Sequence, residues 1–307
     1  MTKVFIDGSA GTTGLRIRER LACRSDIELV ILSEEQRKDT SARKEALNSC
    51  DIAFLCLPDA AAIEAVSLVE NPNTVIIDTS TAHRTAEGWA YGMPELSGQR
   101  EKIKAAKRIA NPGCHASGFV ALVRPLVECG IIPKSARLSA FSLTGYSGGG
   151  KKMIAEYEGD ERDELFDAPR QYALTQSHKH LPEMKTLTSL EYEPVFCPIV
   201  ADYYSGMEVT VPLFSADING TREDICRVYK EYYKDGLIAF CEDAGEGGML
   251  SACAYSGNDG MEISVQGNED RILLVARFDN LGKGASGAAI QNMNILLGAD
   301  DGEGLDL

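Results

Sequence analysis

Short apolar runs alternate with helical patterns over the first 110 residues of the chain. The runs are rich in β-branched residues, have the length of strands, and span residues 4–6, 27–32, 52–57, 74–77 and 108–110. Apolar positions at helical spacing lie between them, in residues 15–21, 42–47 and 60–69. Because the strand runs are apolar at successive positions, they predict a parallel sheet covered by helices on both faces, with ligands bound beyond the carboxyl ends of its strands.

The pattern changes after about residue 115. Phe119, Leu122, Val123 and Leu126 repeat at helical spacing, although Pro125 is expected to kink or shorten that helix. Longer strand patterns follow in residues 138–143, 208–213, 261–265 and 272–278, and residues 284–297 return to a helical pattern. We therefore expect an α/β domain formed by residues 1–113 plus 284–307, and a sheet-rich α+β domain formed by residues 114–283.

Composition narrows the class of protein. A length of 307 residues suits about two domains, and no apolar run approaches the ~18 residues that a membrane span needs. The net charge of −15, with no cluster of Lys and Arg, argues against nucleic acids and membrane surfaces as partners. The amino terminus enters the first strand without an apolar signal region, which predicts a cytoplasmic location. Nine cysteines without a C-x-x-C pair argue against a disulfide framework and a structural zinc site.

A glycine-rich turn follows the first strand pattern, with the spacing G-x-x-G-x-x-G. Glycines allow a tight turn and a close approach of the backbone to a ligand, and the N–H groups at a helix start bind a pyrophosphate. The turn therefore predicts a dinucleotide site, although a glycine-rich turn without a ligand is the alternative. The expected cofactor contacts are Gly8, Ser9, Gly11, Thr12, Thr13 and Gly14.

The end of the second strand pattern bears on the choice of cofactor. Ser33 with Arg37 nearby suits the 2′-phosphate of NADP, because an NAD site usually places an acid here to bind the ribose hydroxyl. NADP(H) is therefore the predicted cofactor. Glu34 or Glu35 could instead bind the ribose of NAD, and Arg37 could belong to a solvated helix start.

The sequence Asn111-Pro112-Gly113-Cys114 places a thiol between a strand and a helix. Proline and glycine favour a tight turn, and a thiol at the first helical position faces unpaired N–H groups, which lower its pKa. The same N–H groups could stabilise an oxyanion on a carbon bonded to the sulfur. Cys114 is therefore the candidate nucleophile, with a buried structural cysteine as the alternative.

A thiol nucleophile needs a proton partner, and the chain has only four histidines. His178 and His180 lie in a segment without clear periodicity, which suggests a loop, and either could be the general acid/base. A zinc site is the alternative for this pair, but no further ligands lie near in the sequence. His115 follows the nucleophile and is expected to face solvent at the helix start.

Two further segments could bind an anion. Arg84 follows the fourth strand pattern, where it could pair with a substrate carboxylate or phosphate, and an unpaired surface arginine is the alternative. Residues 146–152 form a second glycine-rich stretch with two lysines, which suggests either an anion-binding loop or a mobile one.

In this order, these segments resemble the N-acetyl-γ-glutamyl-phosphate reductase family, in its shorter form, which is related to aspartate-semialdehyde dehydrogenase. The resemblance covers nearly the whole chain. It is carried by the segments 4–8, 11–14, Asp78-Thr79-Ser80-Thr81-Ala82-His83-Arg84, 91–96, Asn111-Pro112-Gly113-Cys114, His178-Lys179-His180 with Glu183, and 279–285. The implied fold class is α/β, with a Rossmann-type dinucleotide-binding domain and a second α+β catalytic and dimerisation domain.

The resemblance also implies an activity. Cys114 would attack the γ-acyl phosphate of N-acetylglutamate and release phosphate, and NADPH would reduce the resulting thioester to the semialdehyde, a step of arginine biosynthesis. His178 would be the acid/base, whereas Arg84, His180 and Glu183 would orient the substrate; the choice of His178 over His180 comes from the resemblance alone. The family also implies a homo-oligomer, either a dimer or a tetramer. No metal is expected, because the residues near the histidine pair supply no further ligands.

Three other functions are considered beside this one. A reductase of the aminoadipate analogue or of aspartyl phosphate differs too little in its substrate for a sequence pattern to exclude it. A non-catalytic dinucleotide-binding regulator would have no need for both Cys114 and a histidine partner. A redox sensor based on Cys114 would need a resolving cysteine near it.

Overall fold

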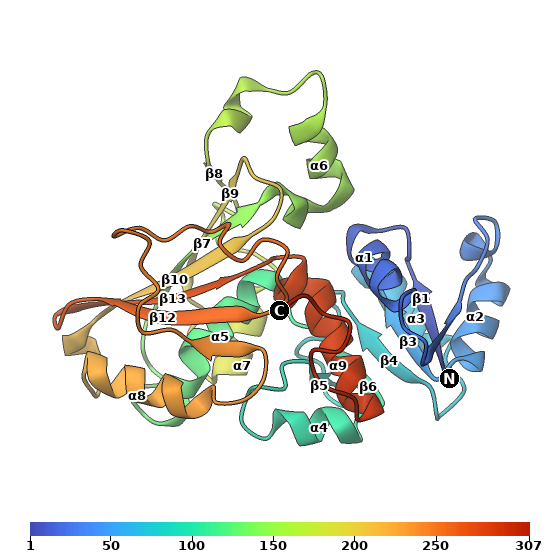
Figure 1. Cartoon of the computed structure of the whole chain (residues 1–307), viewed down its shortest axis with the longest axis horizontal. Coiled ribbons are helices and arrows are strands. Elements are labelled where there is room, and N and C mark those ends of the chain that lie inside the picture. Colours follow the sequence, from blue (N-terminus) through green and yellow to red (C-terminus); the bar gives the residue numbers. More distant parts are fainter. The chain divides into compact units, whose positions relative to one another are not determined.

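Six parallel strands form the sheet of the first unit, which comprises Met1–Gly113 and Ala285–Leu305. We describe all 307 residues from a computed structural model (Figure 1). In sheet order the strands are β2 (Ile27–Val30), β1 (Thr2–Asp7), β3 (Ile52–Leu55), β4 (Val75–Asp78), β6 (Arg108–Ala110) and β5 (Ala90–Tyr91). Because all neighbours run parallel, the carboxyl ends of these strands lie at one edge of the sheet.

Helices cover both faces of this sheet. Val4 and Ile6 of β1 point into one apolar cluster, which also contains residues of the helices α1 (Thr12–Leu21), α4 (Gln99–Ala105) and α9 (Gly287–Leu297). Phe5 points to the opposite face, where α2 (Thr40–Ser49) and α3 (Asp59–Ser67) supply the buried partners. The alternation of β1 residues between two buried clusters explains why its sequence is apolar at the successive positions Val4, Phe5 and Ile6.

A mixed sheet of seven strands forms the second unit, which comprises Cys114–Gly284 and Asp306–Leu307. In sheet order the strands are β11 (Ile238–Phe240), β12 (Met261–Gly267), β13 (Arg271–Phe278), β10 (Met207–Phe214), β7 (Ser139–Gly145), β9 (Val195–Ala201) and β8 (Arg170–Gln171). The helices α5 (Cys114–Glu128) and α8 (Arg222–Tyr232) pack on one face, and α7 (Leu181–Thr188) packs on α5. The helix α6 (Gly150–Glu158) completes the unit. The predicted fold class is confirmed.

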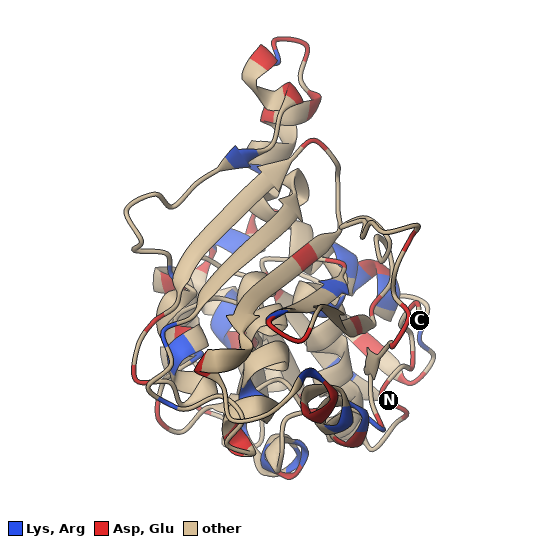
Figure 2. Ribbon diagram, turned by 90° about the vertical axis from the view of Figure 1, so that its left-hand side faces the viewer, with Lys and Arg blue, Asp and Glu red and all other residues tan.

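The other face of the seven-stranded sheet carries exposed apolar side chains. Burial alternates along β7 and β10, so that Phe141 and Phe214 point outward with 43% and 62% of their surface exposed. Val195 of β9 and Leu273 of β13 are exposed by 57% and 38%. Figure 2 looks toward these strands, which carry few charged residues. An apolar face of this kind is typical of a contact surface.

The helix α5 continues to Glu128 through Pro125, so the expectation that Pro125 shortens it is wrong. Proline has no N–H, and the carbonyl of Ala121, four residues earlier, therefore lacks its usual helical donor. The Tyr233 hydroxyl donates a 2.7 Å hydrogen bond to that carbonyl, in the interior of the unit. A tertiary hydrogen bond thus replaces the one that the proline removes.

Several elements were not predicted from the pattern. The strand β9 contains Pro198 in its middle, and a proline normally argues against a central strand. The helix α8 begins with a capping box formed by Thr221 and Asp224, a signal that the sequence does contain. No helix in the structure combines the length and the apolar character needed to cross a membrane.

We expect Tyr233→Phe to lower the free energy of unfolding by about 1–3 kcal/mol, because it leaves the buried Ala121 carbonyl without this donor. Tyr232→Phe is the matched control, since the Tyr232 hydroxyl donates to the exposed Glu128 carboxylate and its loss should cost less than about 0.5 kcal/mol. Urea unfolding followed by circular dichroism measures both. Equal losses in the two variants would show that Tyr233 does not support the helix at Pro125.

Candidate active site

Cys114 is the first residue of α5 and is partly exposed. Asn111, which follows β6 and begins the turn before α5, donates from its side-chain amide to the Ala285 carbonyl at 2.9 Å. Gly284 packs closely beside the thiol, since a Cβ atom on this glycine would lie 3.0 Å from the Cβ of Cys114. The structure therefore keeps the thiol at a helix start, and a side chain at position 284 would crowd it.

Three of the four histidines gather in the second unit. The ring of His115 lies 5.7 Å from that of His178 and 5.6 Å from that of His180, measured between centroids. The rings of His178 and His180 are 4.7 Å apart and nearly perpendicular, and the His180 N–H donates to Nδ1 of His178 at 3.2 Å. Phe196 packs edge-on against both His115 and His178. The cluster combines imidazoles with an apolar wall.

His115 does not face solvent, so that expectation is wrong. Its side chain is buried, and its Nδ1 and Nε2 each lie 2.7 Å from a hydroxyl, those of Ser142 and Tyr172 respectively. Burial, together with the positive charges of His178 and Lys179, lowers the pKa of His115 to about 3. The ring is therefore neutral at working pH, with one nitrogen as donor and the other as acceptor.

Tyr172 was not identified from the sequence. It lies in the loop after β8, and its ring is 6.0 Å from the ring of His178. Burial raises the pKa of Tyr172, and negative charge at Cys114 raises it further. The hydroxyl is thus protonated at neutral pH and lies within electrostatic range of the thiol.

His180 and Glu183 are both buried, and the segment that holds them is only partly a loop. The helix α7 begins at Leu181, directly after His180, so Glu183 lies in the first helical turn. Pro182 near the helix start is a signal for this that the sequence contains. A carboxylate in a first turn is favoured by the helix dipole.

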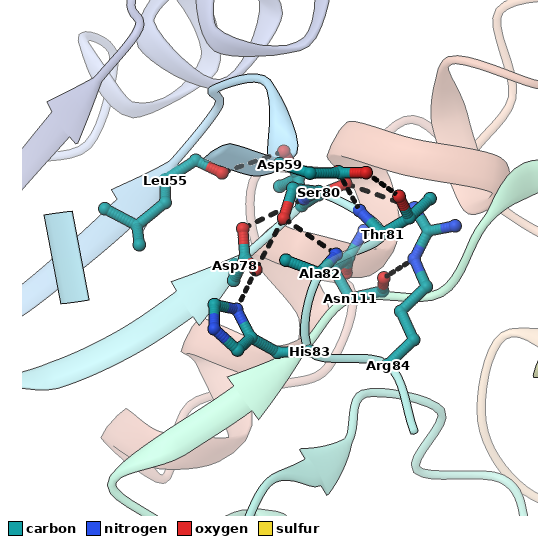
Figure 3. A network of polar contacts seen from close by, with 10 residues as sticks. Leu55, Asp59, Asp78, Ser80, Thr81, Ala82, His83, Arg84 and Asn111 are labelled. Carbon is teal, nitrogen blue, oxygen red and sulfur yellow. Dashed lines mark hydrogen bonds and ion pairs between the residues drawn. The ribbon is translucent and has the colours of Figure 1, made fainter. Parts of the chain in front are cut away.

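Arg84 is held by the backbone of the first unit (Figure 3). Its Nε donates to the carbonyl of Asn111 at 3.0 Å, and its Nη2 donates to the carbonyl of Thr79 at 3.1 Å. The loop before it is rigid, because the buried Asp78 carboxylate lies 2.6 Å from Nδ1 of His83 and accepts a bond from the Ser80 hydroxyl at 2.7 Å. Arg84 is therefore not a loose surface side chain.

The glycine-rich turn between β1 and α1 allows a ligand to approach its backbone closely. Gly8 has a φ of +87°, and a Cβ there would lie 2.2 Å from the Cys56 carbonyl oxygen. Gly11 is the N-cap of α1, no side chain caps the first N–H groups, and no acidic residue lies in the first turn. Thr12, Thr13 and Gly14 form that turn. These features fit a pyrophosphate.

The end of β2 provides groups that suit a second phosphate. Arg37 follows β2 in a short 3-10 helix, and it lines a hollow together with Ser9 and Arg18. The Nε of Arg37 is buried and has no hydrogen-bond partner, while its Nη2 pairs with the exposed Glu34 at 3.3 Å. Ser33 is exposed, and its hydroxyl accepts from the Gln36 N–H. Arg18 was not identified from the sequence, because nothing in the pattern relates it to Arg37.

Two alternatives from the sequence find little support. Residues 146–152 form a 3-10 helix and the start of α6, not a loop. No group of three or more His, Cys, Asp and Glu side chains is arranged to hold a metal ion. Both nitrogens of His115 already have hydroxyl partners, so this ring is not available as a third imidazole ligand beside His178 and His180.

Two family models match the chain. The model described as semialdehyde dehydrogenase, NAD binding domain, matches residues 3–106, and the model described as semialdehyde dehydrogenase, dimerisation domain, matches residues 114–280. Among curated proteins, an N-acetyl-gamma-glutamyl-phosphate reductase 2 of Nostoc sp. is 46% identical over 99% of both chains. An N-acetyl-gamma-glutamyl-phosphate reductase of Rhizobium meliloti is also 46% identical, over 97% of this chain and 99% of its own.

Solved structures share the fold at low sequence identity. Aspartate semialdehyde dehydrogenase II of Vibrio cholerae superposes with a TM-score of 0.75 at 16% identity, over 97% of this chain and 98% of its own. Aspartate semialdehyde dehydrogenase of Candida albicans, solved with NADP, gives a TM-score of 0.67 at 16% identity, over the same shares of the two chains. At this identity the likeness concerns the fold alone.

The burial of His115 predicts loss of stability in acid. Because its pKa of about 3 in the folded chain lies below the ordinary value of 6.5, the unfolded chain binds the extra proton, and stability falls as the pH drops below about 6.5. We expect this group to contribute a loss of about 2 kcal/mol between pH 6.5 and 5. Urea unfolding at both pH values, for the native chain and His115→Gln, measures it. An unchanged pH dependence in the variant would contradict the neutral, buried state.

Proposed function

The chain belongs to the N-acetyl-γ-glutamyl-phosphate reductase family of the semialdehyde dehydrogenases. From this membership we propose that it reduces N-acetyl-L-glutamyl 5-phosphate with NADPH, giving N-acetyl-L-glutamate 5-semialdehyde and phosphate, as a step of arginine biosynthesis. The observation that carries the proposal is the thiol of Cys114 at the start of α5, directly before His115, which belongs to a cluster of three histidines.

Cys114 is the nucleophile of the proposed reaction. Its sulfur attacks the γ-acyl carbon, the bond to the phosphate oxygen breaks, and a thioester on Cys114 forms. The two easier steps that result replace one difficult displacement. The N–H groups of the first turn of α5 stabilise the oxyanion that develops on the acyl oxygen.

His178 is the proposed acid/base. It is partly exposed, unlike the buried His115 and His180, so it can exchange protons with solvent and reactants. It takes the proton of the Cys114 thiol before attack. After reduction of the thioester it protonates, and then deprotonates, the oxygen of the thiohemiacetal, which collapses to the aldehyde and releases the thiolate.

The first unit holds the proposed cofactor. Bound NADPH supplies the hydride that reduces the thioester carbonyl. Gly8, Ser9, Gly11, Thr12, Thr13 and Gly14 bind the pyrophosphate through backbone N–H groups and hydroxyls. Ser33 and Arg37 bind the 2′-phosphate, which is supported by the unpartnered Nε of Arg37 in the hollow at the end of β2. Glu34 is less suited to a ribose, because its carboxylate pairs with Arg37.

Arg84, His180 and Glu183 are the proposed substrate-binding residues. Arg84 is fixed by two backbone carbonyls, which suits a guanidinium that must present a constant geometry to a carboxylate or phosphate. His180 and Glu183 are buried on either side of the start of α7. Groups held in this way lose little freedom when a substrate binds.

The proposed assembly is a homo-oligomer, either a dimer or a tetramer, and the proposed location is the cytoplasm. Self-association through the outward face of the seven-stranded sheet would cover its exposed apolar residues, of which Phe141, Val195 and Leu273 lie on three different strands. The cytoplasm suits nine cysteines that form no disulfide.

We expect Cys114→Ala to abolish activity, by at least about 10³-fold, because no other group can carry the acyl intermediate. The assay is the reverse reaction, phosphate- or arsenate-dependent reduction of NADP by N-acetylglutamate semialdehyde. NADPH binding, measured by its fluorescence, should be retained. The matched control is Cys129→Ala, beyond the other end of α5, which should keep the native rate. Substantial activity of Cys114→Ala would remove this residue as nucleophile, and an inactive native chain would make the substrate assignment wrong.

We expect Phe141→Asp and Leu273→Asp to shift the protein to the monomer mass, because each places a charge on the apolar face. Ile63→Asp on α3, where the side chain is 55% exposed, is the matched control and should leave the mass unchanged. Light scattering coupled to size-exclusion chromatography measures the mass. A native monomer, or variants that remain associated, would contradict assembly through this face.

A further inference from the structure

We propose that His115 and Tyr172 are positioning residues of the thiol site, in which the neutral His115 ring anchors the Tyr172 hydroxyl and the two rings together hold His178. The proposal rests on the proposed function, since it concerns the group assigned as acid/base. It adds two residues that are not among the proposed catalytic, substrate-binding or cofactor-binding residues, and that act through His178.

The first observation is the hydrogen bonding of His115. Its Nδ1 lies 2.7 Å from the Ser142 hydroxyl of β7, and its Nε2 lies 2.7 Å from the Tyr172 hydroxyl. A neutral imidazole has one donor and one acceptor, so each hydroxyl takes one of the two roles. The ring thus bridges the sheet to the loop that carries Tyr172, and it cannot rotate without breaking both bonds.

The second observation is the packing around His178. Its ring meets His115 edge-on at 5.7 Å between centroids, with 86° between the ring planes. Tyr172 meets it at 6.0 Å, and Phe196 meets it at 5.1 Å. Edge-to-face contacts of this kind favour one orientation of the ring. Because the Tyr172 ring is itself anchored on His115, the orientation of His178 depends on that hydrogen bond.

The third observation concerns charge. The groups facing His115 are His178, Lys179, His180 and the hydroxyls of Ser142 and Tyr172. No carboxylate is among the groups that shift its pKa, and burial is the main reason why the ring stays neutral. A protonated His115 would repel a protonated His178. A neutral bridge therefore positions the acid/base without opposing the charge that His178 acquires when it accepts a proton.

The position of His178 should also act on the thiol. Negative charge at Cys114 raises the pKa of Tyr172, so the two side chains lie within electrostatic range of each other. In the proposed function His178 accepts the proton of Cys114, and an imidazolium near a thiol favours the thiolate. A His178 ring loosened by loss of the Tyr172 hydroxyl should therefore also make Cys114 less readily deprotonated. The effect on the thiol can be measured without substrate or cofactor.

The test compares Tyr172→Phe with the native chain. We expect kcat to fall about 10- to 100-fold with KM for the semialdehyde changed less than about twofold, because a loosened ring misplaces the acid/base. We also expect the pH midpoint for alkylation of Cys114 by iodoacetamide, followed by mass spectrometry of its peptide, to rise. The control is Tyr233→Phe, which removes another 2.7 Å hydrogen bond of a tyrosine in the same unit and should change stability alone.

A second pair of variants tests the neutral role of His115. His115→Gln keeps one donor and one acceptor and should retain much more activity than His115→Leu, which keeps neither. A native kcat and an unchanged alkylation midpoint in Tyr172→Phe would overturn the proposal, as would a Gln variant no better than Leu. If the native chain does not act on the semialdehyde, the proposed function fails, whereas the alkylation midpoints still decide whether Tyr172 supports the thiol.

Discussion

The hydrogen bonding of Asn111 is the constraint on which the rest of the site depends. Its N–H donates to the Asp78 carbonyl at 2.8 Å, its carbonyl accepts from Arg84, and its side-chain amide donates to Ala285. Three separate segments of the first unit thereby hold the residue that precedes Pro112 and Gly113. The chain then enters the second unit with Cys114 as the first residue of α5. The turn that ends a parallel strand is thus followed directly in the chain by the helix that carries the thiol.

Burial divides the three clustered histidines into different chemical roles. His115 is buried between two hydroxyls and stays neutral, and its contribution is therefore hydrogen bonding and packing. His178 is partly exposed, so a proton can reach it. The different roles that we propose for these identical side chains thus follow from the desolvation of one ring and the exposure of the other.

The helix α5 shows how local and tertiary interactions share the same task. Pro125 removes one backbone hydrogen bond of α5. The Tyr233 hydroxyl, at the end of α8, replaces it by donating to the Ala121 carbonyl. Gly118 acts through packing instead, since a Cβ there would lie 2.6 Å from the Val209 side chain of β10. The missing side chain allows α5 to pack closely on the sheet. The helix that begins with Cys114 is therefore held both along its length and against the strands behind it.

The sequence by itself determined those features that depend on neighbouring residues. The apolar runs identified the parallel sheet, the glycine spacing identified the turn at Gly8, and Asn111-Pro112-Gly113-Cys114 identified the thiol between strand and helix. Only the tertiary structure decided which distant groups meet. It buried His115, brought Tyr172 to it across 57 positions of the chain, and placed Arg18 with Arg37. Such contacts depend on how loops and strands far apart in the sequence pack together. A pattern of residue types along one chain does not show which distant segments meet.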